Sequence, residues 1–170
     1  MTKIEALSLS SSYVENVLKH TFLADLLQTA WRIDHTRKIN VFDAEVDDSG
    51  FDLVVSSGHT FRHIQLKSTH SAGHARSISA HTALSSALGG CIVWLFYSAE
   101  TLRIEHYRFF GEQSGGAMAD ISGLPKTKTV RRDIHGQRRE REHHRKIKLS
   151  AFSPPLSIEQ LYECLFGNEP

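Results

Sequence analysis

Apolar residues recur every four positions from Val14 to Leu26 near the start of the chain. This spacing places them on one face of an α-helix. A run of serines precedes the pattern, and Glu15 follows Ser12 by three residues, which is the spacing of a capping box. The pattern therefore predicts a long first helix over residues 12–33.

Alternation of apolar and polar residues takes over after this helix and predicts three strands. The first covers Lys38–Val46, and the next two cover Phe51–Ser56 and Phe61–Ser68. Between the last two, Gly58 and His59 suit a two-residue hairpin loop. The pattern thus predicts a tight hairpin after an earlier strand.

The second half of the chain has weaker patterns. The elements that it predicts are a helix over Ile78–Leu88, a buried strand over Cys91–Tyr97, a strand over Thr101–Phe110, a loop over Gly111–Gly123, a short strand over Lys146–Phe152 and a final helix over Ile158–Phe166 that Ser157 caps. The order α-β-β-β-α-β-β, with a later insertion and a helix, predicts an α/β fold with a mixed sheet.

The length of 170 residues is that of a single domain covering 1–170. Within it we expect a core over 12–110, a loop and basic segment over 111–148, and a C-terminal strand and helix over 149–170. The first residues have no signal-peptide pattern, and no apolar run approaches the roughly 20 residues that span a bilayer. We therefore expect a cytoplasmic protein with no membrane association.

The net charge of +1 is unevenly distributed. Residues 126–148 contain ten Lys or Arg and three acidic residues, a local charge of +7, so the rest of the chain carries −6. Such a block is commonly a solvated surface, and it also suits contact with a polyanion. The segment lacks interleaved aromatic residues, which favours contact with backbone phosphates over stacking on single strands. The candidate nucleic-acid-binding residues are Arg131, Arg132, Arg138, Arg139, Arg141 and Arg145.

The predicted hairpin brings three polar residues together. With Gly58 and His59 at the loop centre, antiparallel pairing places Asp52 opposite Gln65, with Cβ atoms about 4.5–5.5 Å apart. Lys67 lies two residues beyond Gln65 and emerges on the same face. This face therefore carries a carboxylate, an amide and an ammonium group. The residues expected on the opposite, apolar face are Phe51, Leu53, Ile64 and Leu66.

These groups suit the hydrolysis of a phosphodiester. That reaction needs a cation at the phosphate, an activated water and positive charge near the developing negative charge. Mg²⁺ prefers oxygen ligands and needs only one or two carboxylates, so Asp52, the Gln65 side-chain carbonyl and the Leu66 backbone carbonyl are candidate ligands for Mg²⁺ or Mn²⁺. Lys67 is the candidate for orienting the water.

An ordinary explanation competes with this hypothesis. An aspartate and a lysine placed diagonally on a hairpin commonly form an exposed salt bridge that contributes little energy. On the hairpin alone, a surface ion pair between Asp52 and Lys67 is the favoured interpretation. The surrounding elements change that balance.

The order of elements around the hairpin resembles the PD-(D/E)XK nuclease superfamily, which includes restriction endonucleases and archaeal-type Holliday junction resolvases. In that superfamily an acid lies on the first helix, an aspartate on the second strand and a (D/E/Q)-x-K motif on the third. The corresponding residues here are Glu15, Asp52 and the motif Gln65-Leu66-Lys67. The resemblance covers the predicted core and extends to uncharacterised bacterial families with a D…QxK motif.

The resemblance implies a restriction-endonuclease-like fold, with an αβββαβ core and a mixed central sheet flanked by helices. It also implies metal-dependent hydrolysis of phosphodiester bonds in nucleic acid, with DNA as the expected substrate. The catalytic residues would be Asp52, Gln65, Lys67 and Glu15. A duplex-cleaving enzyme of this size often acts as a homodimer.

Two positions leave alternatives open. Gln65 stands where an acid is commoner, which predicts weaker metal affinity, although similar glutamine variants occur in the superfamily. Glu15 is equally well explained as the capping-box partner of Ser12, and Glu45, one strand before Asp52, is the substitute metal ligand. A second hypothesis is therefore a catalytically inactive nuclease-fold module that binds nucleic acid or a protein partner.

Overall fold

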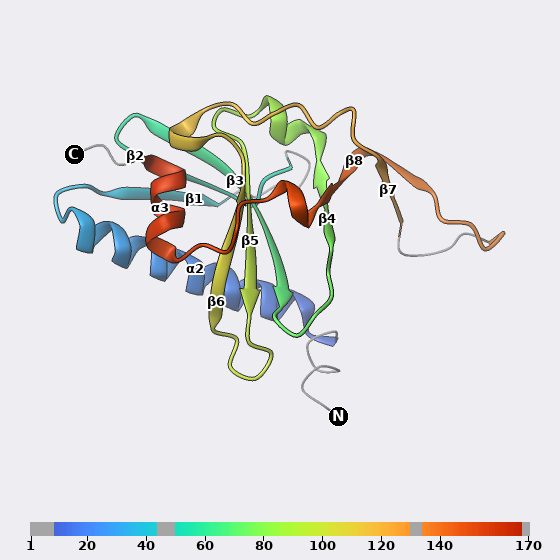
Figure 1. Ribbon diagram of the computed structural model, residues 1–170, viewed down its shortest axis with the longest axis horizontal. Coiled ribbons are helices and arrows are strands. Elements are labelled where there is room, and N and C mark those ends of the chain that lie inside the picture. The colour runs from blue at the N-terminus through green and yellow to red at the C-terminus, as the bar shows by residue number, and fades with distance from the viewer. Residues whose placement is uncertain (1–8, 44–49, 130–133, 168–170) are drawn as a thin grey trace.

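The computed structural model describes residues 9–43, 50–129 and 134–167. Its centre is a five-stranded mixed sheet with the order β1-β2-β3-β5-β6 (Figure 1). The pairs β1–β2, β2–β3 and β5–β6 are antiparallel, and β3–β5 is parallel. These strands are β1 (Ile39–Asp43), β2 (Leu53–Ser57), β3 (Thr60–His70), β5 (Cys91–Tyr97) and β6 (Ile104–Phe110).

A second sheet of three antiparallel strands has the order β4-β8-β7. It joins a strand from the predicted core to the basic segment, because Ser77 pairs with Lys148. The strands and remaining elements are β4 (Ser77–His81), β7 (Lys126–Lys128), β8 (Glu140–Lys148), the 3₁₀ turns η2 (Thr82–Ser86), η3 (Gln113–Gly115) and η4 (Leu149–Ala151), and the helices α2 (Ser11–Ile33) and α3 (Ile158–Phe166).

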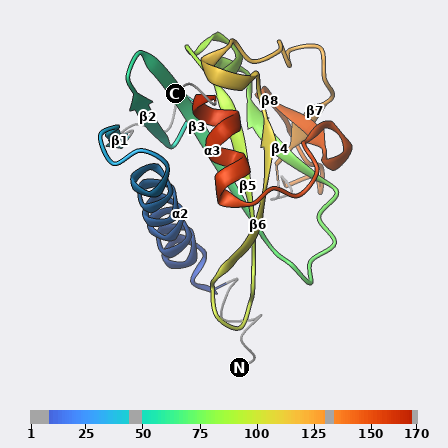
Figure 2. The same cartoon turned by 60° about the vertical axis from the view of Figure 1, so that its left-hand side comes forward.

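The main sheet lies between two apolar clusters. One face packs against α2 and α3 through residues such as Leu18, Leu53 and Leu165. The other face packs against the second sheet through Trp94 and Ile147, and Figure 2 shows helices and second sheet on opposite sides of β5. Every residue of β5 is buried, as expected for a strand covered on both faces.

The predicted first and last helices are confirmed, but only one of their caps is. Ser157 and Gln160 form the reciprocal bonds of a capping box at the start of α3. The capping box predicted for Ser12 and Glu15 is wrong, because α2 begins at Ser11 and its N-cap residue is Ser10, with no side-chain cap bond. Glu15 therefore lies within the helix and is not a cap partner.

The helix predicted over Ile78–Leu88 is also wrong. Its first residues form β4, whose alternating side chains pair with the distant strand β8, and its next residues form the 3₁₀ turn η2. η2 ends at Ser86, and in the turn that follows it Gly89 has a φ of 60°, where a Cβ would lie 2.1 Å from the Phe61 carbonyl oxygen. The turn into β5 therefore requires glycine.

The boundaries of several other strands also differ from the predictions: β2 spans Leu53–Ser57 instead of Phe51–Ser56, β3 spans Thr60–His70 instead of Phe61–Ser68, and β6 and β8 differ most. β6 begins at Ile104 because a tight turn occupies the preceding residues, where Leu102 has a φ of 56°. β8 runs over Glu140–Lys148 instead of the predicted Lys146–Phe152, and the 3₁₀ turn η4 follows it. The extension arises because β8 pairs along β4 and β7, which the local sequence does not indicate.

The predicted hairpin register is confirmed for the five pairs from Ser57–Thr60 to Leu53–Ile64. The architecture as a whole is mixed α/β, with a mixed central sheet flanked by helices on one side, and it is consistent with the expected restriction-endonuclease-like fold. None of the helices in the described residues has the length and hydropathy needed to cross a membrane.

Arg62 on β3 connects the main sheet to the end of α3. Its side chain is fully buried, and its guanidinium donates hydrogen bonds of 2.7 Å to the Leu165 and Cys164 carbonyl oxygens. The guanidinium also lies over the Phe109 ring at 5.6 Å. These carbonyls belong to the last turn of a helix, where no intrahelical donor remains for them.

We predict that Arg62→Met destabilises the protein by about 2–4 kcal/mol, because it leaves two carbonyls without donors. Urea denaturation followed by circular dichroism would measure the loss. Arg103→Met, at an exposed position, is the matched control and should lie within about 0.5 kcal/mol of wild type. Equal stability of the two variants would contradict the role given to Arg62.

Candidate active site

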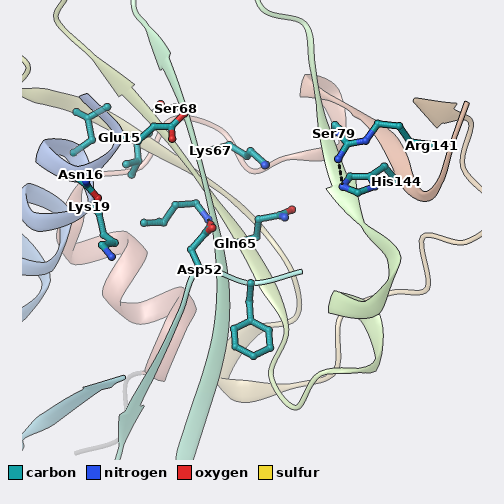
Figure 3. A pocket seen from close by; sticks show the side chains of 14 residues that line it. Glu15, Asn16, Lys19, Asp52, Gln65, Lys67, Ser68, Ser79, Arg141 and His144 are labelled. Carbon is teal, nitrogen blue, oxygen red and sulfur yellow. Dashed lines mark hydrogen bonds between the residues drawn. The ribbon is translucent and has the colours of Figure 1, made fainter. Parts of the chain in front are cut away.

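A cavity of about 560 Å³ opens where the hairpin β2–β3 meets α2 and the second sheet. Its lining includes Asp52, Gln65 and Lys67, the three residues that the sequence singled out. Figure 3 shows Glu15, Asn16 and Lys19 on one side of these residues and Ser79, Arg141 and His144 on the other. The cavity therefore collects polar groups from four parts of the chain.

Asp52 lies at the point where the β2–β3 ladder ends. Its backbone N–H donates to the Ile64 carbonyl at 2.8 Å, and its carboxylate Oδ2 accepts the Leu66 N–H at 2.6 Å. A side chain thus replaces the next backbone acceptor along the edge of β3. This bond fixes the position of the carboxylate relative to β3.

The backbone bond from the Asp52 N–H to the Ile64 carbonyl corrects the predicted hairpin at its end, because Asp52 does not lie directly opposite Gln65 as expected. The pairing of Asp52 with Ile64 is offset by one residue from the register of the preceding pairs, and a one-residue offset moves side chains to the other face. Phe51 accordingly packs against the apolar cluster that contains Trp94 and Ile147. Its ring meets the His63 ring edge-on, with 4.7 Å between the ring centroids. The prediction that Phe51 shares the apolar face of Leu53 is wrong.

The Leu66 backbone contributes a second group at this edge. In an extended strand the N–H and C=O of one residue point to the same side. Because the Leu66 N–H points to the Asp52 carboxylate, its carbonyl oxygen points to the same side, beyond the last β2–β3 pair, Leu53 with Ile64. The predicted Leu66 ligand oxygen is thus directed at the edge that lines the cavity.

The Gln65 side chain has an acceptor that is not used. The residue is 8% exposed, and its Oε1 is buried without a hydrogen-bond partner among the described residues. An unsatisfied buried carbonyl costs roughly 1–3 kcal/mol. A cation bound in the cavity would satisfy this oxygen, so the donor set fits a hard divalent metal ion.

Lys67 does not form the surface ion pair that the ordinary explanation required. Both residues are described, and no salt bridge joins Lys67 to Asp52 within the part of the chain that the structure describes. Lys67 instead points across the cavity toward the second sheet (Figure 3), where its charge contributes to lowering the pKa of His144. The ammonium group is therefore available to a ligand.

Helix α2 contributes the acid and a cation at the other wall. Glu15 is exposed and lines the cavity, which supports the second-carboxylate interpretation over the cap. Lys19, one turn later, forms a 2.8 Å salt bridge with Asp43 on β1 and thereby connects α2 to the sheet edge. The alternative carboxylate, Glu45, lies outside the described residues.

Ser79 and His144, which the sequence did not indicate, reach the cavity through the second sheet. Burial, aided by the nearby charge of Arg141, lowers the pKa of His144 to about 4. The imidazole is therefore neutral, and its Nε2 accepts a 2.6 Å hydrogen bond from the Arg141 guanidinium. Only the pairing of β4 with β8 brings these residues to the hairpin, so local patterns could not reveal them.

The structure separates the predicted arginines. Arg141 lines the cavity, whereas Arg138 and Arg139 are exposed just before β8. Arg145 is half-buried, and its guanidinium donates to the carbonyls of Ser122, Glu142 and His144. The remaining two, Arg131 and Arg132, lie outside the described residues.

No group of three or more His, Cys, Asp or Glu side chains suited to a metal ion occurs among residues 9–43, 50–129 and 134–167. Within this part of the chain, metal binding would depend on Asp52, Glu15, the Gln65 amide oxygen and the Leu66 carbonyl. These are hard oxygen donors with few negative charges, which suits weak binding of Mg²⁺ or Mn²⁺.

A search of solved structures finds a similarity to Hjc, a Holliday junction resolvase from Archaeoglobus fulgidus. The sequences are 16% identical, the TM-score is 0.39, and the match covers 83% of this chain and 97% of that chain. A scan against protein-family models and a search of curated proteins find no match. At this TM-score the likeness carries no argument about the family or the function of this chain.

We predict that the His144 pKa rises from about 4 toward its ordinary value of 6.5 in Arg141→Gln, because a neighbouring positive charge is removed. The rise should be incomplete, since burial is the largest cause. An NMR titration of the imidazole resonances would measure both values. Arg103→Gln is the control and should leave the His144 titration unchanged.

The low pKa also sets the direction of the pH dependence of stability. The folded state holds His144 neutral down to about pH 4, whereas the unfolded chain binds the proton near pH 6.5. His144 therefore destabilises the fold progressively as the pH falls from about 6.5 to 4 and adds no further change below that window. The free energy of unfolding of Arg141→Gln should therefore fall less steeply over this pH window than that of wild type. An equally steep fall would contradict the role assigned to Arg141.

Proposed function

We propose that this protein is a divalent-metal-dependent phosphodiester hydrolase of the PD-(D/E)XK type that acts on DNA. The observation that carries the proposal is the unsatisfied Gln65 Oε1 in the same cavity as the anchored carboxylate of Asp52. A buried oxygen that accepts no hydrogen bond and lies near a carboxylate is expected at a cation site, because a bound cation would satisfy both groups. An ordinary surface hairpin does not need such an arrangement.

Each residue of the chain has a defined task in this proposal. Asp52, Gln65 and the Leu66 carbonyl would hold Mg²⁺ or Mn²⁺, and Glu15 or Glu45 would add the second carboxylate. The bound metal ion supplies Lewis acidity at the phosphate and lowers the pKa of a coordinated water. Lys67 orients the attacking water and stabilises negative charge that develops on the phosphate.

The second sheet would hold the substrate. The β7–β8 hairpin extends away from the main sheet (Figure 1), and Arg138 and Arg139 are exposed along it. Arg141 lies nearer, in the cavity wall. Positive side chains thus lie in a row from the cavity wall outward along the β7–β8 hairpin. This arrangement suits contact with the sugar–phosphate backbone of DNA. Cleavage of both strands of a duplex needs two such sites, which favours a homodimer.

A second candidate function is a nuclease fold that binds nucleic acid or a protein partner without cleavage. Two features favour it: Gln65 replaces an acid, and the described residues contain no cluster of three metal-binding side chains. Mn²⁺ titration by calorimetry separates the two candidates. Binding that disappears in Asp52→Asn supports the hydrolase, and absence of any such binding supports the inactive module.

We predict that purified protein cleaves DNA in the presence of Mg²⁺ or Mn²⁺ and that Asp52→Asn and Lys67→Ala each reduce the rate at least about 100-fold. A gel assay on linear, supercoiled and branched DNA would measure the rates. The matched controls are Glu163→Gln for Asp52 and Lys38→Ala for Lys67, both at exposed positions outside the cavity lining. Cleavage that survives both active-site substitutions would refute the assignment.

We also predict that Arg138→Ala/Arg139→Ala weakens binding to duplex DNA without regard to sequence. Each lost phosphate contact should reduce the slope of log K against log salt by about 0.9. Fluorescence anisotropy at several salt concentrations would measure the slope. The control Lys38→Ala/Arg103→Ala removes the same amount of charge elsewhere and should leave the slope unchanged. An unchanged slope in Arg138→Ala/Arg139→Ala would show that the β7–β8 hairpin does not contact DNA phosphates.

A further inference from the structure

Helix α2 carries a second apolar stripe in addition to the one that packs on the sheet. Its members are separated alternately by four and three residues, which is the spacing of the contact positions in a coiled coil. The stripe therefore runs straight along the helix for about five turns. Its members are Tyr13, Val17, His20, Ala24, Leu27 and Trp31.

This stripe lies on the outer side of the helix. The buried residues of α2, such as Leu18 and Leu26, face the sheet, and at 100° per residue the stripe is centred on the opposite side. Tyr13 and Trp31 are each 67% exposed, and Leu27 is 41% exposed. In both ribbon views no other part of the described chain covers this side of α2 (Figures 1 and 2).

No Lys, Arg, Asp or Glu stands in the stripe or beside it on the helix surface, within about 60° of its centre line at 100° per residue. The flanking positions are the uncharged Asn16 and Gln28. Three charged side chains of the helix bond elsewhere, since Lys19 pairs with Asp43, Asp25 accepts from Tyr107, and Arg32 pairs with Glu159, and the fourth, Glu15, lines the cavity. A surface helix normally exposes charge, so this uncharged face suits contact with another uncharged apolar face.

We propose that the stripe binds the same stripe of a second copy, with the two helices antiparallel about a two-fold axis near residue 22. This arrangement places Tyr13 against Trp31 of the partner subunit and Val17 against Leu27 of the partner subunit. At the centre, His20 lies against Ala24 of the partner subunit, a large side chain against a small one. The same surface on both copies makes the contact isologous and closed.

The area available is sufficient for a specific contact. A large aromatic side chain buries roughly 150–250 Å², and two-thirds of Tyr13 and of Trp31 is exposed in the single chain. With the smaller members of the stripe, each copy would bury on the order of 500 Å². The pair then buries about 1,000 Å² in total, the lower bound for a specific interface. The burial of an uncharged face leaves no desolvated ion behind.

The dimer would hold two cavities in a fixed relation. Glu15 of each copy belongs to α2, and the two-fold axis separates the two Glu15 residues by roughly 21 Å along the helix direction. The interpretation of this distance as the separation of two cutting sites rests on the proposed nuclease function. The contact itself depends on the helix surface and is tested without any measurement of activity.

The test is the molecular mass in solution, measured by light scattering over a range of protein concentrations. We expect wild-type protein to be dimeric at high concentration, and Leu27→Glu/Trp31→Glu to be monomeric with an unchanged circular dichroism spectrum. Leu88→Glu changes a residue that is equally exposed at 67% but lies outside the stripe, and it should remain dimeric. A monomeric wild type, as expected if the stripe binds a different protein, or a dimer that persists in the double variant overturns the proposal.

Cysteine cross-linking tests the antiparallel orientation. In a Cys164→Ser background, mild oxidation should join His20→Cys/Ala24→Cys into a covalent dimer, because these positions face each other. The single variants should not cross-link, since each cysteine is then about one helical turn from its equivalent, beyond the Cα separation of roughly 7 Å that a disulfide tolerates. Cross-linking of Ala24→Cys alone would indicate parallel helices and overturn the proposed pairing.

Discussion

The hydrogen bond from the Leu66 N–H to the Asp52 carboxylate determines what the hairpin can do. A regular ladder would have paired this N–H with a backbone carbonyl and left the carboxylate to solvent. Because a side chain takes that place, β2 begins only at Leu53, whereas β3, which runs antiparallel to it, continues past Ile64 to His70. Within the described residues this edge of β3 has no strand partner beyond Ile64, and it lines the cavity. The carboxylate of Asp52 is held there by the Leu66 backbone N–H.

The remaining parts of the molecule hold this edge in place from three directions. On one face, α2 supplies Glu15 and is connected to β1 through Lys19. On the other face, the second sheet supplies Arg141 and a neutral imidazole at His144. The buried strand β5 lies beside β3 and packs into both apolar clusters. The polar cavity is thus supported by two separate cores.

Local sequence signals predicted the main sheet well and the second sheet poorly. The Gly58-His59 turn fixes the hairpin register as far as Leu53 and Ile64, but the offset at Asp52, which bonds to Ile64 instead of lying opposite Gln65, could not be found by counting from the turn. The strand β4 is short, and the apolar spacing from Ile78 onward suits a helix as well as a strand; only pairing with β8 decides between them. The cap was misplaced because three consecutive serines offer alternative starts to α2.

The pairing of β4 with β8 has a kinetic consequence. Ser77 and Lys148 meet only after the intervening chain has closed a long loop, whereas the β2–β3 hairpin closes across two residues. Loop-closure entropy and contact order both place such a distant pairing late in folding. The wall that carries Arg141 and His144 is therefore assembled after the hairpin that carries Asp52, and the order of folding is also the order in which the cavity is enclosed.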